Sequence, residues 1–216
     1  DCCTCDGITI AEISENGQVI ETLEERLKGR YLVEDLVDTR TGEVLACASY
    51  PTYNLQTYNE MYDEILKQDF DPLFNRAFHA SYPPGSTYKM CTLIAAMESG
   101  KVTADEIIKD GGIFLTYKED FFTPTCLVWS NYRYTHGDLV AWQALMRSCN
   151  YYFYELGDRL TEKELDETAK GLGLGEPTGV ELPENIGWRA NPESKKAQYG
   201  ESLDASWFPG DLILAG

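Results

Sequence analysis

A turn that leads directly into a helix is the feature of this sequence that most restricts its fold, and it spans YPPGSTYKMCTLIAAMESGK at residues 82–101. The Pro-Pro-Gly segment at 83–85 is unsuited to a helix interior. We therefore expect a helix that begins at or beside Ser86 and ends at Gly100. Apolar residues recur in this stretch at helical spacing and predict one buried helix face. The residues expected on that face are Met90, Leu93, Ile94 and Met97.

Ser86 and Lys89 lie three residues apart at the start of the predicted helix. Residues at this spacing share a face, so the hydroxyl and the amine would be within reach of each other. A lysine held partly out of water loses its proton more easily, and such an amine beside a serine hydroxyl is typical of an activated nucleophile. In the alternative interpretation Ser86 is only an N-cap and Lys89 a solvated side chain. The spacing by itself does not decide between the two.

Length and charge exclude several classes of protein. A chain of 216 residues is long enough for one domain with a substantial core, or for two small ones. The sequence contains no apolar stretch long enough to span a bilayer and does not open with a signal peptide. Its 36 acidic residues outnumber its 18 basic ones, which gives a formal net charge of -18. Such a charge repels a phosphate backbone, so we do not expect nucleic acid as a partner.

The cysteine count is odd and leaves the redox compartment open. There are seven cysteines, and no CxxC pair is repeated, so neither a zinc ribbon nor a complete disulfide framework is indicated. Three of them, Cys2, Cys3 and Cys5, form the terminal segment DCCTC, which we interpret as an exposed or artefactual terminus. The others are Cys47, Cys91, Cys126 and Cys149.

Strand signals precede helix signals along the chain, which favours the α+β class with helices packed on an antiparallel sheet. The opening segment, about 6–29, predicts a strand at 7–13 and an amphipathic helix from 16. Residues 31–50 predict an antiparallel hairpin. A mostly helical region follows at about 85–175, with a capping box at Thr161–Glu164. Residues 176–216 show little periodicity and are expected to be irregular.

A second polar motif, Ser148-Cys149-Asn150, lies between a helix that ends near Arg147 and the aromatic run YYFYELG. A serine and an asparagine two residues apart on a short loop can both point into a cleft. The pair is a weak signal alone. Together with PPGSTYK it matches the first two of three motifs, S-x-x-K, a relative of S-D-N, and K-T-G, in serine acyl-transfer enzymes that bind penicillin.

On these motifs the chain resembles the transpeptidase domain of a class B, or monofunctional, penicillin-binding protein. Further similar stretches are LVDTRTGEVLACASYPTYN, THGDLVAWQALMRSCNYYFYELG and SWFPGDLILAG, so the resemblance covers nearly all of residues 1–216. The Lys-Thr-Gly motif is absent from the sequence. The resemblance therefore implies a partial transpeptidase domain, with a sheet that is incomplete at the C-terminus. We do not expect such a domain to be active without the remaining C-terminal part.

The resemblance implies a peptidoglycan DD-transpeptidase that β-lactams inhibit. In that family Ser86 would attack the D-Ala-D-Ala unit of a stem peptide and form an acyl-enzyme. Lys89 would take the Ser86 proton, Ser148 would relay a proton to the leaving nitrogen, and Asn150 would bind the substrate amide. It also implies cell-wall synthesis partners. The expected location is the extracytoplasmic face of the cell membrane, with an N-terminal anchor that is not in this chain.

Cys126, His136 and Cys149 surround the second motif, and thiolates with an imidazole are ligands that zinc takes in closed tetrahedral sites. Some members of the family with this arrangement resemble the chain closely and hold a zinc with an aspartate as fourth ligand. Our candidate for that ligand is Asp120, with Asp138 as the second choice. Such a zinc would be structural. In the alternative interpretation Cys149 only packs and His136 belongs to a common His-Gly turn.

Two other functions remain open on the sequence. A β-lactamase or a β-lactam sensor shares the Ser-x-x-Lys motif and the fold class, but class A β-lactamases also need a glutamate that activates water, and no such loop is identified. The other alternative is a non-catalytic module of a cell-wall assembly.

Overall fold

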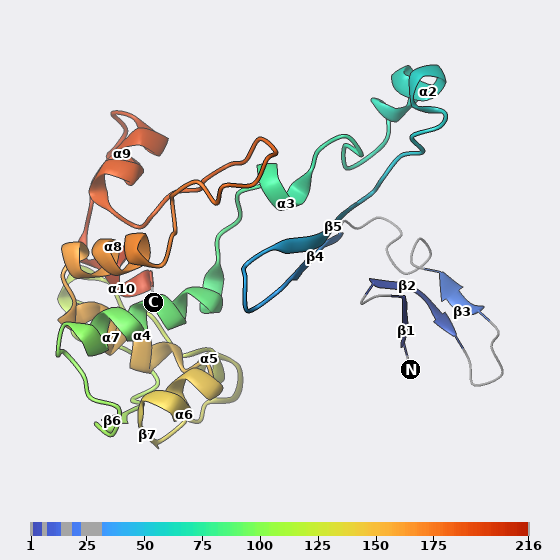
Figure 1. The fold of residues 1–216 in the computed structure, drawn as a ribbon. Coiled ribbons are helices and arrows are strands. Elements are labelled where there is room, and N and C mark those ends of the chain that lie inside the picture. The colour runs from blue at the N-terminus through green and yellow to red at the C-terminus, as the bar shows by residue number, and fades with distance from the viewer. Residues whose placement is uncertain (1, 6–7, 14–18, 23–31, 216) are drawn as a thin grey trace. The chain divides into compact units, whose positions relative to one another are not determined.

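The computed structural model describes residues 2–5, 8–13, 19–22 and 32–215, with side chains from residue 36 onward. The chain divides into two compact units. The first consists of residues 1–81 with 181–185, and the second of residues 82–180 with 186–216. Figure 1 traces the elements of both, which mix helices with small antiparallel sheets, as the predicted α+β class requires.

The first unit opens with a three-stranded antiparallel sheet of order β1-β2-β3. Its strands are β1 (Cys2–Cys5), β2 (Ile8–Ile13) and β3 (Val19–Thr22). Strand β2 confirms the predicted strand at 7–13. The predicted helix from residue 16 is wrong over 19–22, where the sequence VIET is mostly β-branched and favours a strand. The rest of that predicted helix lies outside the described residues.

The predicted hairpin at 31–50 is confirmed. Strands β4 (Leu32–Val37) and β5 (Val44–Tyr50) pair in antiparallel register. The turn between them is held by Asp38, whose carboxylate accepts the Arg40 backbone N–H at 2.8 Å. Gly42 closes the turn at a φ of +78°, a conformation that glycine adopts without a steric penalty.

Two short helices complete the first unit. They are α2 (Tyr58–Ile65) and α3 (Arg76–His79). Ser49 on β5 accepts the backbone N–H of Arg76 at 3.2 Å, which fixes the start of α3 beside the hairpin.

The second unit holds both sequence motifs. In chain order its helices and strands are η1 (Gly85–Tyr88), α4 (Lys89–Glu98), β6 (Ile108–Lys109), η2 (Lys118–Asp120), α5 (Leu127–Tyr132), β7 (Asp138–Leu139), α6 (Ala141–Met146), α7 (Asn150–Arg159), α8 (Glu162–Gly171), α9 (Pro192–Tyr199), η3 (Leu203–Ala205) and α10 (Pro209–Leu214). The predicted irregular segment at 176–216 thus contains two α-helices. Each begins with a proline at its first position and is too short to show clear periodicity.

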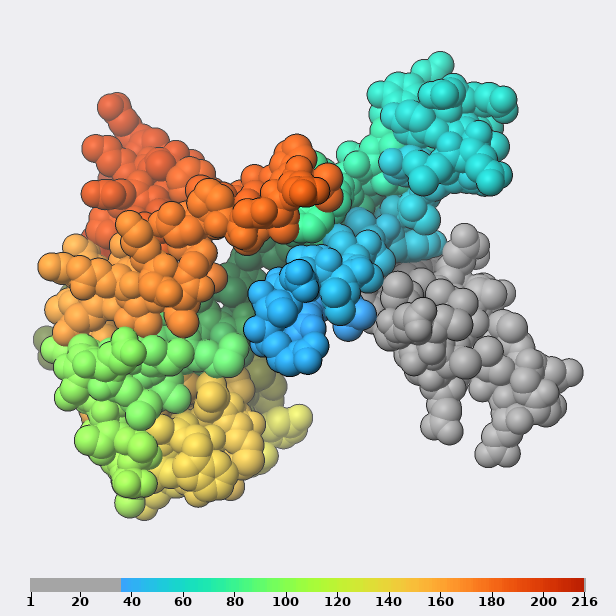
Figure 2. All heavy atoms as spheres, in the orientation of Figure 1, coloured from blue at the N-terminus to red at the C-terminus, as the bar shows by residue number. Residues whose placement is uncertain are grey.

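Helices α4, α7 and α8 form the core of the second unit, and the space-filling view shows its segments, coloured green to red, packed against one another (Figure 2). The core residues of α7 include Phe153 and Leu156, both with no exposed surface. Helix α4 contributes Ala95 and Ala96, whose small side chains allow the neighbouring helices to approach closely. Within the described residues no helix is long and apolar enough to cross a bilayer.

The predicted buried face of α4 is largely wrong. Leu93 is buried, but Met90, Ile94 and Met97 are 56%, 36% and 42% exposed. The helix instead packs through its smaller residues, because these face α7 and α8. The buried residues of α4 are Lys89, Cys91, Thr92, Leu93, Ala95 and Ala96.

A close contact with α10 fixes the position of α7. A Cβ atom added at Gly157 would lie 2.8 Å from the Ile213 Cα and 3.0 Å from the Leu212 carbonyl oxygen. Only glycine allows the two backbones to approach this closely. The N-terminus of α7, which carries the second motif, is therefore supported by a tightly packed helix pair.

Candidate active site

The first motif lies where a 3₁₀ turn passes into a longer helix. The helical start predicted beside Ser86 is this 3₁₀ turn, and the α-helix begins at Lys89. Gly85 begins η1 at a φ of +56°, and Ser86 follows it on the surface. Lys89 is the first residue of α4 and is buried, with 1% of its surface exposed. Gly100 follows the end of the helix at a φ of +69°, which is typical of a helix C-terminus.

The Lys89 amine joins the two motifs. Its Nζ donates to the Ser148 hydroxyl and to the Ser148 carbonyl, both at 3.0 Å. It also donates to the Asn150 side-chain oxygen at 2.5 Å. Burial lowers the pKa of Lys89 below its ordinary value, while the nearby thiols Cys149 and Cys126 act in the opposite direction. The buried amine can therefore release its proton more easily than a solvated lysine.

The loop between α6 and α7 presents Ser148 and Asn150 on the same side. Ser148 has a φ of +49°, in the left-handed region, which costs a non-glycine residue about 1–2 kcal/mol. The Cys149 N–H donates to the Ala144 carbonyl at 3.0 Å and holds the loop against α6. As a result Ser148 and Asn150 contact Lys89, whereas the intervening Cys149 is fully buried.

A cavity of about 580 Å³ opens beside these residues. Ser86, Lys89 and Asn150 form part of its lining. Within the described part of the chain the Ser86 hydroxyl has no hydrogen-bond partner, so it is free to meet a ligand. Catalytic hydrogen bonds often form only once a substrate is bound.

One wall of the cavity is not predicted from the sequence. It comes from the segment at 188–215, for which the sequence indicates neither regular structure nor a role. Aromatic side chains on this wall include Trp188, Tyr199 and Trp207. Two cations lie on this wall, and both are paired. Lys195 donates to both carboxylate oxygens of Asp211 at 2.7 Å, and Arg189 donates to Asp166 at 2.8 Å.

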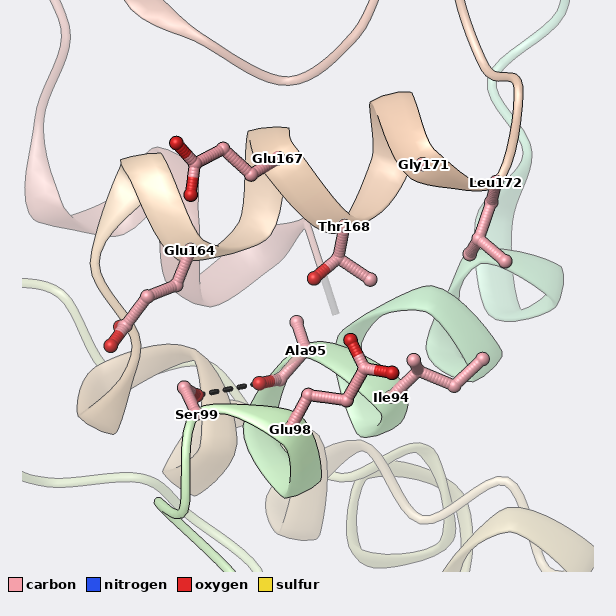
Figure 3. Close-up of a pocket in the computed structure, with 9 residues that line it drawn as sticks. All are labelled: Ile94, Ala95, Glu98, Ser99, Glu164, Glu167, Thr168, Gly171 and Leu172. Atoms are coloured by element: carbon pink, nitrogen blue, oxygen red, sulfur yellow. Dashed lines mark hydrogen bonds between the residues drawn. The ribbon is translucent and has the colours of Figure 1, made fainter.

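A separate groove of about 460 Å³ lies between α4 and α8 (Figure 3). Its carboxylates belong to Glu98, Glu164 and Glu167. None of the motif residues lines it, and Glu164 is engaged in the predicted capping box with Thr161. We therefore assign the groove no part in the site.

Four side chains converge beside the second motif: the buried Asp110, Cys126 and Cys149 and the partly buried His136. One ligand atom from each lies within 4.8 Å of all the others. The Cys126 Sγ is 3.5 Å from His136 Nδ1 and 4.0 Å from the Cys149 Sγ. His136 Nδ1 is 2.9 Å from the Asp110 carboxylate. The structure thus brings together the three predicted ligands Cys126, His136 and Cys149.

The predicted fourth ligand, Asp120, does not lie in this cluster. Asp120 is exposed at the end of η2, and the second choice, Asp138, is exposed on β7 opposite Lys109. Asp110 occupies the place instead, with 2% of its surface exposed. It follows β6 directly, and an aspartate before two glycines is a turn signal that could have drawn attention to it.

Hydrogen bonds shift the pKa values of the acidic groups in this cluster. Burial alone would raise the pKa of Asp110, but donors from the backbone of His136 and Gly112 outweigh it and lower that pKa. The thiol of Cys149 donates to the Cys126 sulfur, which lowers the pKa of Cys126 and raises that of Cys149. A buried carboxylate is costly without a compensating cation. The donor types of the four residues fit a divalent metal such as zinc.

Comparison with known proteins assigns the fold and the motifs to a family. The family model "Penicillin binding protein transpeptidase domain" matches residues 35–207. The chain is 31% identical over 196 residues to the Peptidoglycan D,D-transpeptidase MrdA of Acinetobacter baumannii, covering 88% of this chain and 28% of the relative. The chain therefore belongs to the penicillin-binding protein transpeptidase family, as the class B resemblance predicts. It spans less than a third of the length of that relative.

Solved structures agree with this assignment. The chain matches PBP2 of Pseudomonas aeruginosa in complex with WCK 5153 with a TM-score of 0.75 and 28% identity, covering 89% of this chain and 43% of that one. A structure described as "Structural coordination of polymerization and crosslinking by a peptidoglycan synthase complex" matches with a TM-score of 0.68 and 27% identity. That match covers 84% of this chain and 30% of the other. The predicted fold is thereby confirmed.

Proposed function

We propose that the protein carrying this chain is a peptidoglycan D,D-transpeptidase that works through a serine acyl-enzyme. The single observation that supports this best is the buried Lys89 amine, bonded to Ser148 and Asn150 in the cavity that Ser86 also lines. The name of the A. baumannii relative supports the same activity.

In the proposed mechanism Ser86 is the nucleophile and Lys89 the general base. Lys89 takes the hydroxyl proton as Ser86 Oγ attacks the carbonyl carbon between the two D-alanines of a stem peptide. The C–N bond then breaks, Ser148 passes a proton to the leaving nitrogen, and the terminal D-alanine departs. Asn150 holds the substrate amide. The amine of a second stem peptide attacks the ester, which forms the cross-link and returns Ser86 to its hydroxyl form.

Labelling with a fluorescent penicillin tests the nucleophile. In the full-length protein we expect one label per molecule at Ser86, because a β-lactam resembles the D-Ala-D-Ala unit and should acylate the same oxygen. Ser86→Ala should abolish the label, whereas Ser130→Ala, an exposed hydroxyl outside the cavity, should retain it. Labelling of Ser86→Ala at another residue would overturn the assignment.

We also propose that Asp110, Cys126, His136 and Cys149 hold one structural zinc. The support is their mutual distance, the burial of Asp110, Cys126 and Cys149, and their donor types. A bound zinc would tie the start of α5 to the start of α7. The residues themselves take no part in proton transfer, since Lys89 already serves Ser86. Zinc here would contribute to folding, as closed sites of thiolate and imidazole do.

The proposed setting is the extracytoplasmic face of the membrane, where stem peptides and β-lactams meet the enzyme. The similarity to a subunit of a peptidoglycan synthase complex supports partners in cell-wall synthesis, and the MrdA relative points to the same process. Fractionation of cells with an antibody to the protein would test the location, and co-purification from the membrane fraction would test the partners.

A further inference from the structure

Two of the four residues in the buried cluster are thiols in direct contact. The Cys126 and Cys149 sulfurs are 4.0 Å apart, and their side chains are 1% and 0% exposed. A disulfide requires a sulfur separation of about 2.0 Å, which side-chain rotation from contact distance can reach where the Cβ atoms are close enough. Both residues are the N-caps of helices, α5 for Cys126 and α7 for Cys149.

We propose that Cys126 and Cys149 are an oxidisable pair that a hydroperoxide converts into a disulfide, and that a zinc bound to the same thiolates prevents this. The disulfide does not depend on transpeptidase activity. Its exclusion by zinc rests on the proposed metal site.

The reaction is a two-electron oxidation of the thiols. One cysteine thiolate attacks hydrogen peroxide, the O–O bond breaks, and a sulfenic acid forms with release of hydroxide. The second thiolate then attacks the sulfenic sulfur, the S–S bond forms, and a second hydroxide leaves. With the two thiol protons counted, two thiols and one hydrogen peroxide give one disulfide and two waters.

The burial of the two thiols restricts which oxidants can reach them. A bulky disulfide such as oxidised glutathione would have to form a mixed disulfide with a thiol that has at most 1% of its surface exposed. Hydrogen peroxide is close to water in size and needs far less space. The pair should therefore respond to hydrogen peroxide and resist oxidised glutathione.

Zinc binding and disulfide formation exclude each other because both need the thiolate electron pairs of Cys126 and Cys149. Zinc is held by deprotonated thiolates, and a disulfide sulfur carries no such charge. Oxidation would leave only Asp110 and His136 as ligands, too few for a closed site. It would also replace a metal-mediated link between α5 and α7 by a direct covalent one.

The test uses the full 216-residue chain, freed of metal and reduced, then treated with hydrogen peroxide under native conditions. Free thiols are blocked in denaturant, and peptides are mapped by mass spectrometry. We expect a cross-linked peptide containing Cys126 and Cys149, two hydrogens lighter than the reduced pair, while the buried Cys91 stays reduced. Zinc at about 100 times its dissociation constant should slow the reaction roughly 100-fold, because about one site in a hundred is then free.

Two results would overturn the proposal. One is metal-free protein in which both thiols stay reduced, or in which Cys126 passes to sulfinic acid without a cross-link. The other is an unchanged oxidation rate in protein shown to hold one zinc. Cys149→Ala supplies a further check, since its Cys126 should stop at a sulfenic acid that dimedone traps. If that variant does not fold, the arm with oxidised glutathione, expected to give no cross-link in the unmodified chain, takes its place.

Discussion

The two clusters of polar side chains that meet at residues 148–150 differ in their access to solvent. Ser148 is exposed, and Asn150 lines the cavity that contains Ser86. Cys149 lies between them with no exposed surface and contacts Cys126. One short segment thus contributes to two clusters. The open cluster, Ser86, Lys89, Ser148 and Asn150, lies at the cavity, and the closed cluster, Asp110, Cys126, His136 and Cys149, does not line it.

This difference indicates that the two clusters have separate roles. The open cluster offers a hydroxyl and a buried amine to a reacting group, whereas the closed cluster does not line the cavity and can hold only a small species such as a metal ion. Because the same loop belongs to both, the closed cluster should set the position of the reacting groups. Variants of either cluster can test that dependence, from the largest expected effect to the smallest.

Removal of the Lys89 amine should have the largest effect, and this effect should be confined to the open cluster. Lys89→Met keeps the length of the side chain but cannot accept a proton, so acylation of the full-length protein by penicillin should slow by about 10²–10⁴-fold. Stopped-flow or quenched-flow labelling measures the rate. Zinc content should be unchanged. A Lys89→Met protein that is acylated at the normal rate would remove the general base from the mechanism.

Loss of the Asp110 carboxylate from the closed cluster should have the second largest effect. Asp110→Ala should weaken zinc binding by roughly 10–100-fold or more, because Asp110 contacts His136 and completes the set of four. Asp120→Ala is the matched control and should bind zinc normally, since Asp120 is exposed and outside the cluster. Competition with a zinc-sensitive dye measures both. Equal affinities in the two variants would return Asp110 to a purely structural role.

A methyl group at Gly157 should disturb the support that both clusters share. The added Cβ would meet the Ile213 Cα at 2.8 Å, so Gly157→Ala should lower the free energy of unfolding by about 1–3 kcal/mol. Gly171→Ala, at the end of α8 with nothing within 4 Å, should be neutral or stabilise by about 0.5–1 kcal/mol. Urea unfolding measures the free energy of unfolding of both variants. If Gly157→Ala is the more stable variant, α7 does not depend on its contact with α10.

The pH dependence of stability should show the smallest effect. Burial lowers the pKa of Lys89 in the folded chain below its ordinary value of 10.5. Between the two pKa values unfolding takes up a proton, so this group makes the free energy of unfolding rise with pH. The cost of burying the charged amine is complete below the folded pKa and disappears above 10.5.

Lys89→Met should lose this contribution. Urea unfolding of the unmodified protein and of Lys89→Met, at two pH values between the folded and the ordinary pKa of Lys89, gives the change in free energy of unfolding with pH for each. The difference between these two slopes isolates Lys89 from the other titrating groups. Equal slopes would mean that the folded protein leaves the Lys89 pKa unchanged.

Local sequence signals predicted much of the fold and part of the site. The turn at 83–85 fixed the start of the helix that carries Lys89, because proline and glycine restrict the backbone wherever they occur. The capping box at Thr161 and the hairpin at 31–50 depend on neighbours in sequence, and both are present in the structure. The resemblance to the family, which the two motifs carry, also implied that Lys89, Ser148 and Asn150 act together, and the structure places them in contact.

Tertiary packing decided the rest, and the sequence does not show it. The apolar stripe on α4 predicted burial of Met97, yet the smaller residues face the core because α7 and α8 lie against them. Asp110 joins the closed cluster through a turn that brings it to His136, which is 26 positions away. The strand at 19–22 replaced a predicted helix because the pairing with β2 favours its β-branched residues.

The burial of Cys149 between two accessible neighbours has a consequence for inhibitor design. A compound seated beside Ser86 and Ser148 lies one residue away from a thiol in the sequence, which invites the addition of a cysteine-directed warhead. That thiol does not line the cavity and has no exposed surface, so an electrophile carried by a drug-sized scaffold cannot reach it. Selective covalent inhibitors of this site should therefore carry oxygen-directed groups, and screening libraries enriched in acrylamides should yield few hits that modify Cys149.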